Sequence, residues 1–517
     1  MVTRVSPEDK VIVSNRTALE DKYGAGGFAK IHKAVQALIK ADQKRGLTTK
    51  IYYIDDRRTM DSFGGKFLQD IQDTVIAKKA IDAVYNRLKP DYLMILGSTD
   101  VIPHQDVNNA AYVRGGDDDF EAWGDLPYAC DVPFNTDPAA FVGPTRVVGR
   151  LPDVTGARQP SHLLKLLSVA THWKSRPRQD YEKYFALSTY TARECTRESL
   201  KALFGNDDGI LLAPPKRPGA YTHGQLGALA HFINCHGGDG QSDFYGQKGW
   251  KEPPSLSTRS TLNAIREGTV ASVEACYGAQ LYDPEKEKKD IPICQSYLRQ
   301  GAYGFFGSST TAYGMNGDGE PRVACADLLC TYFLGYVLGG ASIGRAALTA
   351  RHQFAHNCQQ TDPMDLKTLS QFSLLGDPSI QPVAMPGPTD ARTRTEKHVV
   401  ERFQRRERRA KLAATGKFLK DSKPTASIKT RGIDRRAERQ LSEIARKAGL
   451  PHGTEFMAYK IDNALPAPEN KPDLASAPTR YYLAIRKLGP AGRQRRVAVI
   501  AKALDGQIVG HRVYNER

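Results

Sequence analysis

The sequence predicts an α/β protein in which a mainly parallel sheet is flanked by helices and followed by a small C-terminal α+β module. Over the first three quarters of the 517-residue chain, short apolar runs alternate with amphipathic stretches, as in a parallel sheet covered by helices. The tail instead has β-type runs separated by short Gly-containing turns, which is typical of an antiparallel meander. A chain of this length also predicts two or more domains, because a single core rarely grows so large.

Residues 1–150 are predicted to form an N-terminal α/β subdomain. Its apolar runs predict strands at 11–15, 49–55 and 91–97. Apolar residues at helical spacing mark two helix faces, one at Phe28, Ile31, Val35 and Leu38 and the other at Ile76, Ala80, Val84 and Leu88. The second helix is expected to end before Pro90, because proline cannot continue it.

Residues 105–145 interrupt this order with acidic and Gly/Pro-rich sequence, so we expect a long functional loop there. A second α/β subdomain is predicted over residues 151–386. Its elements are expected as strands at 146–152, 184–190, 209–213 and 302–310, helices at 163–173, 196–204, 322–338 and 341–355, and a closing segment at 373–382.

A basic segment follows the second subdomain. Residues 390–447 hold 19 Lys and Arg against 8 Asp and Glu, which supplies +11 of the net charge of +16. We interpret residues 387–433 as a basic linker or exposed helix. Contact with nucleic acid phosphates and self-cleavage at its Arg and Lys bonds are the alternatives. Residues 434–517 predict a helix at 434–448 and then the meander, a module for interaction, regulation or substrate presentation.

The cysteine content and hydropathy indicate where the protein works. The eight cysteines are spread along the chain without a CxxC pair, which suits a reducing compartment. No apolar run approaches the roughly 20 residues that span a bilayer, and the N-terminus lacks the pattern of a signal peptide. We therefore expect a cytoplasmic protein without a membrane partner.

Two of the predicted strands end in chemically reactive side chains. The apolar run of HFINCHGG ends at His236 before two glycines, and that of TVASVEACYGA ends at Cys276. Carboxyl ends of parallel strands share one sheet edge, so neighbouring strands would place both groups over one crevice. A nearby imidazole raises the thiolate fraction of a thiol, so the pair predicts a Cys–His catalytic dyad. Either residue alone would be interpreted as structural.

Acyl transfer also needs amide donors for the oxyanion of its tetrahedral intermediate. The glycine after the histidine can turn its N–H toward that oxygen. The backbone amides of Gly237 and Cys276 are the candidates.

At these residues the chain resembles the caspase-like clan of cysteine peptidases, whose strands end in His-Gly and Ala-Cys, as here at His236-Gly237 and Ala275-Cys276. Within the clan it is most similar to the gingipain-type family. Four further segments resemble landmarks of that family in the family's order, namely DYLMILGSTDVIPH, RVVGRLP, GAYGFFGSST and LLGDPSI.

The resemblance implies a mainly parallel sheet in two side-by-side subdomains that meet near residue 150. It also implies peptide-bond hydrolysis through an acyl-enzyme on Cys276, with His236 protonating the leaving amine. In gingipain-type enzymes that prefer arginine, an acidic residue just before the GR strand lies in the specificity pocket. The candidates here are Asp131 and Asp137, with Asp125 less favoured, and a solvated loop is the alternative for each.

Tyr313 matches an aromatic pocket wall of that family, and plain packing is the alternative for it. The chain also departs from its relatives. The gingipains are secreted, EACYG differs from the QAC-x-G pattern of caspases, and CHAT-domain proteins and separases share the same His-Gly and Cys landmarks.

The sequence therefore predicts an intracellular cysteine endopeptidase that cleaves after Arg or Lys, in regulated proteolysis or bacterial defence, with a protein or peptide substrate. Self-processing and an activating partner on the C-terminal module are parts of this hypothesis. The alternative is a non-catalytic, nucleic-acid-associated adaptor on a peptidase-like scaffold. No cofactor is expected. A calcium loop at Asn316, Asp318 and Glu320 is the one metal candidate, against a plain turn.

Overall fold

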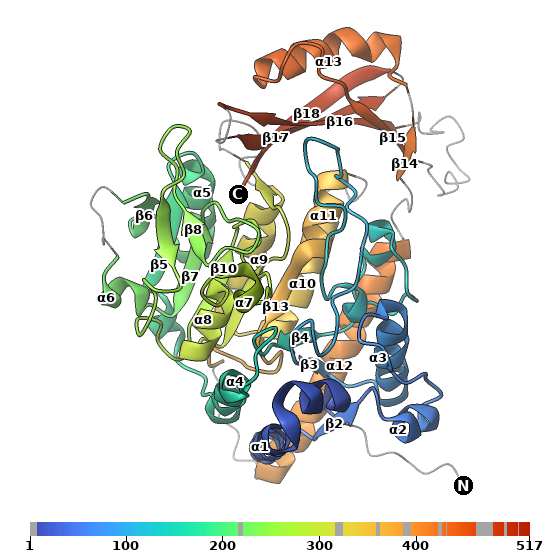
Figure 1. The fold of residues 1–517 in the computed structure, drawn as a ribbon, viewed down its shortest axis with the longest axis vertical. Coiled ribbons are helices and arrows are strands. Elements are labelled where there is room, and N and C mark those ends of the chain that lie inside the picture. The colour runs from blue at the N-terminus through green and yellow to red at the C-terminus, as the bar shows by residue number, and fades with distance from the viewer. Residues whose placement is uncertain are drawn as a thin grey trace.

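The computed structural model describes residues 8–215, 221–315, 324–357, 362–385, 394–421, 427–430, 432–461, 479–490, 494–504 and 506–517. It confirms the predicted α/β class. A ten-stranded sheet forms the centre of the larger, α/β unit (residues 8–421), and a smaller antiparallel sheet belongs to the C-terminal unit (residues 427–517) (Figure 1). Within residues 8–421 the strands run, in spatial order, as β2 (Thr49–Tyr53), β1 (Lys10–Ser14), β3 (Tyr92–Leu96), β4 (Val148–Leu151), β13 (Phe372–Leu375), β11 (Gly304–Ser308), β10 (Val270–Val273), β7 (Ala230–Asn234), β5 (Tyr184–Thr189) and β6 (Ile210–Ala213).

The ten-stranded sheet consists of two parallel halves that face in opposite directions. Strands β2 to β13 are parallel to one another, strands β11 to β6 are parallel to one another, and β13 pairs with β11 antiparallel. The strand from the LLGDPSI segment is therefore the seam, because it returns the chain to the N-terminal half. The predicted boundary at residue 150 falls inside β4.

Helices cover both faces of this sheet. On one face α1 (Arg16–Lys44), α4 (Ser161–His172) and α8 (Ile293–Gln300) follow one another, and on the other α12 (Arg394–Asp421), α10 (Ile343–Asn357), α9 (Ala326–Leu338) and α5 (Arg193–Phe204) do so (Figure 1). The other helices are α2 (Arg57–Ser62), α3 (Thr74–Leu88), α6 (His223–Leu226), α7 (Pro284–Glu287) and α11 (Pro363–Gln371), with 3-10 turns at η1 (Pro127–Ala129), η2 (Pro138–Phe141) and η3 (Arg178–Tyr181). The local sequence determines where several helices begin. Asn15 and Asp73 cap α1 and α3 by accepting hydrogen bonds from backbone amides of the first turn.

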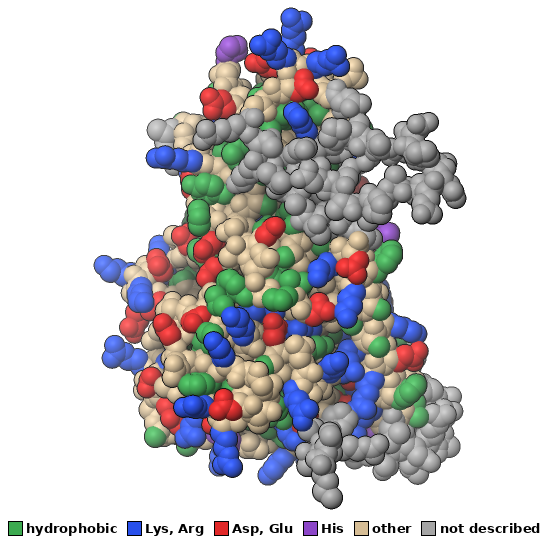
Figure 2. Space-filling model, turned by 90° about the vertical axis from the view of Figure 1, so that its right-hand side faces the viewer, with side chains coloured by type: hydrophobic (Ala, Val, Ile, Leu, Met, Phe, Trp, Pro, Cys, Tyr) green, Lys and Arg blue, Asp and Glu red, His purple; other side chains and the backbone are tan. Residues whose placement is uncertain are grey.

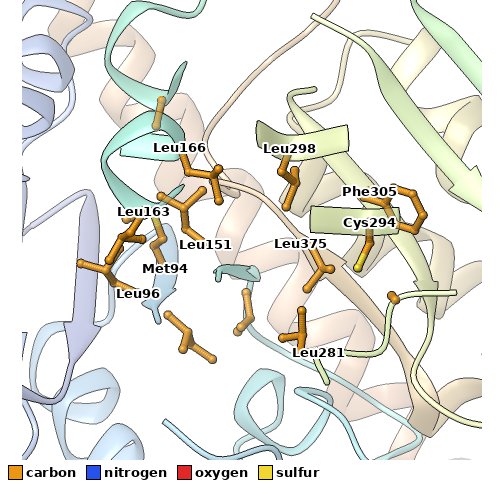
Figure 3. Close-up of a cluster of buried hydrophobic side chains, with 14 of the residues drawn as sticks. Met94, Leu96, Leu151, Leu163, Leu166, Leu281, Cys294, Leu298, Phe305 and Leu375 are labelled. Atoms are coloured by element: carbon orange, nitrogen blue, oxygen red, sulfur yellow. The ribbon is translucent and has the colours of Figure 1, made fainter. Parts of the chain in front are cut away.

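One apolar core crosses the seam. Figure 3 shows Leu163 and Leu166 of α4 and Leu151 of β4 on one side, and Leu298 of α8 and Phe305 of β11 on the other. Leu375 of β13 lies between the two sides in the same buried cluster. Because apolar area is buried across the boundary, the two halves of the sheet are expected to behave as one rigid body.

The C-terminal unit is a sheet buried on both faces. Its strands are β14 (Ser427–Thr430), β15 (Met457–Ile461), β16 (Thr479–Leu488), β17 (Arg495–Leu504) and β18 (Gln507–Glu516), and α13 (Arg435–Lys447) covers one face. Alternate residues of β16 serve different sides. Leu483 and Ile485 pack against the α/β unit, whereas Tyr482 and Ala484 pack under α13.

The C-terminal sheet continues into the α/β unit. Its sixth strand is β12 (Tyr313–Gly314), which lies directly after the turn that follows β11 and pairs with β18 antiparallel. The short hairpin of β8 (Asp243–Tyr245) and β9 (Pro254–Ser257) lies beside this junction. Tyr245 at the end of β8 forms an isolated antiparallel bridge with His236, which follows β7. The two units therefore meet at the ends of β7, β10 and β11.

Much of the segment predicted as a basic linker is α12, and this helix is packed. Arg402 Nη2 lies 3.0 Å from Asp9, and Arg409 Nη1 lies 3.7 Å from Asp91. Gly416 and Gly143 cross so closely that a Cβ on Gly143 would stand 2.0 Å from the Gly416 carbonyl oxygen. In the view of Figure 2, basic and acidic side chains are mixed over the α/β unit. The charge of the segment is thus partly used in internal ion pairs.

Among the described residues, no helix combines the length and the hydropathy needed to cross a membrane.

Candidate active site

The two reactive strand ends predicted from the sequence are neighbours in the sheet. Strands β7 and β10 are parallel, with Ile233 opposite Val273. When this register is continued beyond the ends of the two strands, His236 lies opposite Cys276. The backbones approach so closely there that a Cβ on Gly237 would lie 1.9 Å from the carbonyl oxygen of Cys276. Glycine is thus required after the histidine for steric reasons.

His236 and Cys276 have different hydrogen-bond partners in this structure. The Cys276 thiol accepts a hydrogen bond from the Ala312 amide at 3.2 Å and lies 3.4 Å from the Ala312 carbonyl oxygen. His236 Nε2 lies 3.0 Å from Gln247 Oε1 and 4.0 Å from a carboxylate oxygen of Glu252. Burial raises the pKa of Cys276 well above its usual value and lowers that of His236. Both groups are therefore neutral here.

Both side chains are covered by the end of β18. Cys276 is 1% exposed and His236 is 5% exposed. The residues that cover them, Asn515 to Arg517, run antiparallel to β12, with Glu516 opposite Tyr313. Figure 1 shows the C-terminal end of the chain lying between the two units.

The backbone of Arg517 is held at the reactive centre by three hydrogen bonds. Its amide donates to the carbonyl of Ala312 at 3.0 Å. Its carbonyl oxygen accepts from the amide of Cys276 at 2.9 Å and from that of Gly237 at 3.4 Å. These two amides are the candidates that the sequence suggested for an oxyanion hole, and they converge on one oxygen in the geometry that stabilises a developing negative charge.

The side chain of Arg517 fills a buried pocket, which we call the guanidinium pocket and which is formed by Glu274, Gly314, Met315 and Asp327. Nη2 lies 3.2 Å from Asp327 Oδ1 and also donates to the Met315 carbonyl. Arg517 is 2% exposed and Asp327 is fully buried. Burial alone would lower the pKa of Arg517, but Asp327, Cys195 and Glu274 together outweigh it and the net pKa is raised. The pocket therefore accommodates a charged guanidinium.

The remaining walls of the guanidinium pocket are set by Asp327, Gly314 and Glu274. Asp327 is held in place by donors at Asn234 Nδ2, 3.2 Å away, and the Met315 amide, 2.8 Å away. A Cβ on Gly314 would lie 2.5 Å from Arg517 Nε and 2.6 Å from Nη2, so the guanidinium rests on bare backbone. The carboxylate oxygens of Glu274 have no hydrogen-bond partner among the described residues. Burial and the neighbouring Asp327 raise the pKa of Glu274 well above its usual value.

The structure does not bring the aspartates suggested by resemblance to this pocket. Asp131 is exposed and lies 3.8 Å from Lys417 of α12. Asp137 is exposed and caps η2 through the amide of Ala139. Asp125 is buried but paired with the guanidinium of Arg150. The acidic group at the guanidinium is Asp327, which lies in the first turn of α9 and carries no local signal of a pocket in the sequence.

Tyr313 lies beside the pocket rather than at its base. Its ring is buried under Lys367, its hydroxyl donates to Asp117 at 3.1 Å, and its backbone belongs to β12. The acidic loop predicted as functional reaches the site here. Asp119 accepts from the amide of Thr311 at 2.8 Å and from Lys367 at 2.9 Å. The loop thus fixes the backbone that runs past Cys276.

The calcium candidate at Asn316, Asp318 and Glu320 lies outside the described residues. Within the described part of the chain, no three His, Cys, Asp or Glu side chains gather where they could hold a metal ion. Compared with models of known protein families, the chain matches none, and no curated protein matches it.

Proposed function

We propose that this chain is a cysteine endopeptidase of the caspase-like clan that cleaves polypeptides after arginine, with Cys276 as nucleophile and His236 as general acid and base. One observation carries the proposal. Arg517 sits as the acyl half of a substrate would sit, with its guanidinium on Asp327 and its carbonyl oxygen on the amides of Cys276 and Gly237. The antiparallel pairing of β18 with β12 supplies the extended backbone recognition that peptide ligands use.

In the proposed reaction a substrate arginine takes the place of Arg517. The thiol of Cys276 gives its proton to His236, and the sulfur forms a bond to the arginine carbonyl carbon. His236 accepts that proton on a ring nitrogen of its neutral imidazole. The amides of Cys276 and Gly237 stabilise the resulting oxyanion. The imidazolium then protonates the leaving amine as the C–N bond breaks, which leaves a thioester on Cys276.

Hydrolysis of the thioester closes the proposed cycle. A water molecule gives one proton to His236 while its oxygen bonds to the acyl carbon. The C–S bond then breaks, the thiolate takes the proton from His236, and the peptide leaves as a carboxylic acid that ionises by releasing its proton to water. Lysine would bind less well, because a guanidinium can reach Asp327 and the Met315 carbonyl with two of its N–H groups and an ammonium is a shorter point charge.

A nucleic-acid adaptor is less well supported by the described residues. That alternative depended on the charge of the basic segment, but Arg402 and Arg409 of α12 are engaged by Asp9 and Asp91. A cytoplasmic location, self-processing and a role in defence stay predictions.

The proposed activity is tested with a panel of fluorogenic peptides that differ in the residue before the cut. The panel is run on the wild type and on Arg517→Ala, because the wild-type pocket is filled, and then with Cys276→Ala in each. We expect cleavage after arginine that falls by about 10⁴-fold or more in Cys276→Ala, the scale of loss seen when a nucleophile is removed. Cys235→Ala, which removes a buried thiol from the end of β7, is the matched control and should keep the activity. Cleavage that survives Cys276→Ala, or that ignores the residue before the cut, would contradict the proposal.

Gly314→Val tests the shape of the guanidinium pocket without changing its charge. A side chain there would overlap the guanidinium, so kcat/KM for arginine peptides should fall about tenfold to hundredfold, the effect of overpacking by about 1–3 kcal/mol. The measurement is made in the Arg517→Ala chain. Gly510→Val on β18, where a Cβ would meet nothing within 4 Å, is the control and should change little. Equal effects of the two substitutions would remove Gly314 from the pocket.

A further inference from the structure

We propose that residues 515–517 are an intramolecular inhibitor, which the C-terminal unit holds in the active site of its own chain and which must leave before a substrate can bind. This inference rests on the proposed function, and it adds the regulation of that site. Its first support is occlusion. Cys276, His236 and Arg517 are each at most 5% exposed, so no peptide can reach the thiol while the segment is in place.

The second support is that the segment is part of a docked folded unit rather than a loose tail. Residues 515 and 516 end the long strand β18, which pairs with β17 over most of its length. One face of that sheet is buried against the α/β unit in a shared apolar cluster. The α/β unit contributes residues such as Ala111, Met315 and Met364, and the C-terminal unit contributes residues such as Leu483, Ile485 and Tyr514. Docking therefore brings Arg517 to its pocket at a high effective concentration.

Polar contacts around the site hold the C-terminal unit in register. Lys487 lies 2.7 Å from Asp118, and Arg496 Nε donates to the carbonyl of Gly116 at 2.9 Å, both on the acidic loop. On the other flank Arg495 lies 2.5 Å from Glu252. The acidic loop and the segment that carries Glu252 thus hold the C-terminal unit from two sides of the reactive centre. A substrate must therefore compete with the whole docked unit and not only with three residues.

The docked segment also keeps the dyad in an unreactive state. Burial is the main reason that the pKa of Cys276 is raised, and the carboxylate of Glu516 raises it further. Arg495 holds the carboxylate of Glu252 at 2.5 Å, whereas His236 is 4.0 Å from the same carboxylate. When the unit leaves, water reaches the thiol and Glu252 loses its competing partner. Both changes favour the thiolate and the imidazolium.

The inference is tested by alkylation of Cys276 with iodoacetamide, followed by peptide mass mapping, in the wild type and in Arg517→Ala. Because the described cysteines are all buried, the wild type should react slowly at Cys276. Arg517→Ala removes the anchor of the segment, and we expect Cys276 to react at least about tenfold faster, since a buried ion pair loses one partner. A second variant that lacks residues 515–517 should react at least as fast. Arg439→Ala, at an exposed arginine of α13, is the matched control and should react like the wild type.

Cleavage of an arginine peptide by the same proteins separates this inference from the proposed function. Faster alkylation together with faster cleavage in Arg517→Ala supports both. Faster alkylation without cleavage in either variant supports the occlusion and contradicts the peptidase. Equal alkylation and equal cleavage in wild type and Arg517→Ala leave the peptidase standing and overturn the inhibitor. Unchanged alkylation in both variants overturns the inhibitor whatever the cleavage.

Discussion

Replacing Asp327 with asparagine should lower kcat/KM for arginine peptides by about 10²-fold to 10³-fold, because a buried guanidinium would lose its carboxylate at a cost of about 3–5 kcal/mol. The side chain keeps its size and can still accept from the Met315 amide, so the pocket should keep its shape. The measurement compares peptides with arginine and with citrulline before the cut, in the Arg517→Ala chain. Citrulline has nearly the shape of arginine without its charge.

The ratio of the two substrates isolates the charge at Asp327. The Arg517→Ala chain, which keeps Asp327, should strongly prefer the arginine peptide. Adding Asp327→Asn should remove most of that preference, while cleavage of the citrulline peptide changes little. Asp362→Asn is the matched control, because Asp362 is a buried aspartate outside the guanidinium pocket that caps α11 and has Tyr514 and Arg512 of β18 as neighbours, and asparagine caps a helix equally well. An arginine-to-citrulline ratio that is the same in Asp327→Asn would show that specificity arises elsewhere.

Glu274 is expected to be the neutral carboxyl group of the guanidinium pocket. Two carboxylates buried side by side cannot both ionise at ordinary cost, and the pKa of Glu274 is the one raised well above its usual value. A neutral Glu274 can donate its proton toward Asp327 and leave that carboxylate to the guanidinium. With Glu274 neutral, the bound guanidinium faces a single carboxylate, so the filled pocket holds one positive and one negative charge.

The fold could be predicted from the sequence where periodicity was strong. The runs around Val11, Met94 and Val148 are buried strands as predicted, because each is a short apolar run in a sheet covered on both faces. The packing of α12 was not predicted. Its composition is that of a solvated helix, and its docking depends on partners far away in sequence, Asp9, Asp91 and Pro144.

The candidate site was predictable in part for a similar reason. His236 and Cys276 end apolar runs, and that pattern is local. Glu274 was also within reach, because it directly follows β10 and stands two residues before Cys276 at the same strand end. Asp327 and Arg517 were not, since only the tertiary fold brings α9 and β18 together at the strand ends. The resemblance directed attention to the acidic loop. There Asp119 accepts from the Thr311 amide beside the nucleophile, and Lys367 pairs with both Asp117 and Asp119.

The aspartate of the LLGDPSI segment, Asp377, belongs to a buried ion-pair cluster that joins β1, α1 and this segment. Lys10 of β1 is fully buried and pairs with Asp377 of that segment and with Asp42 of α1, 3.0 Å away. Burial alone would lower the pKa of Lys10, but the two aspartates outweigh it and the net pKa is raised. Lys10→Met would leave Asp377 buried without its cation and Asp42 with Arg45 alone, so we expect a loss of about 3–5 kcal/mol in unfolding free energy. Lys50→Met on the neighbouring strand removes a half-exposed partner of Glu8 and should cost at most about 1 kcal/mol. Urea unfolding followed by near-UV circular dichroism compares the two, and equal midpoints would mean that the buried cluster of Lys10, Asp42 and Asp377 does not stabilise the fold.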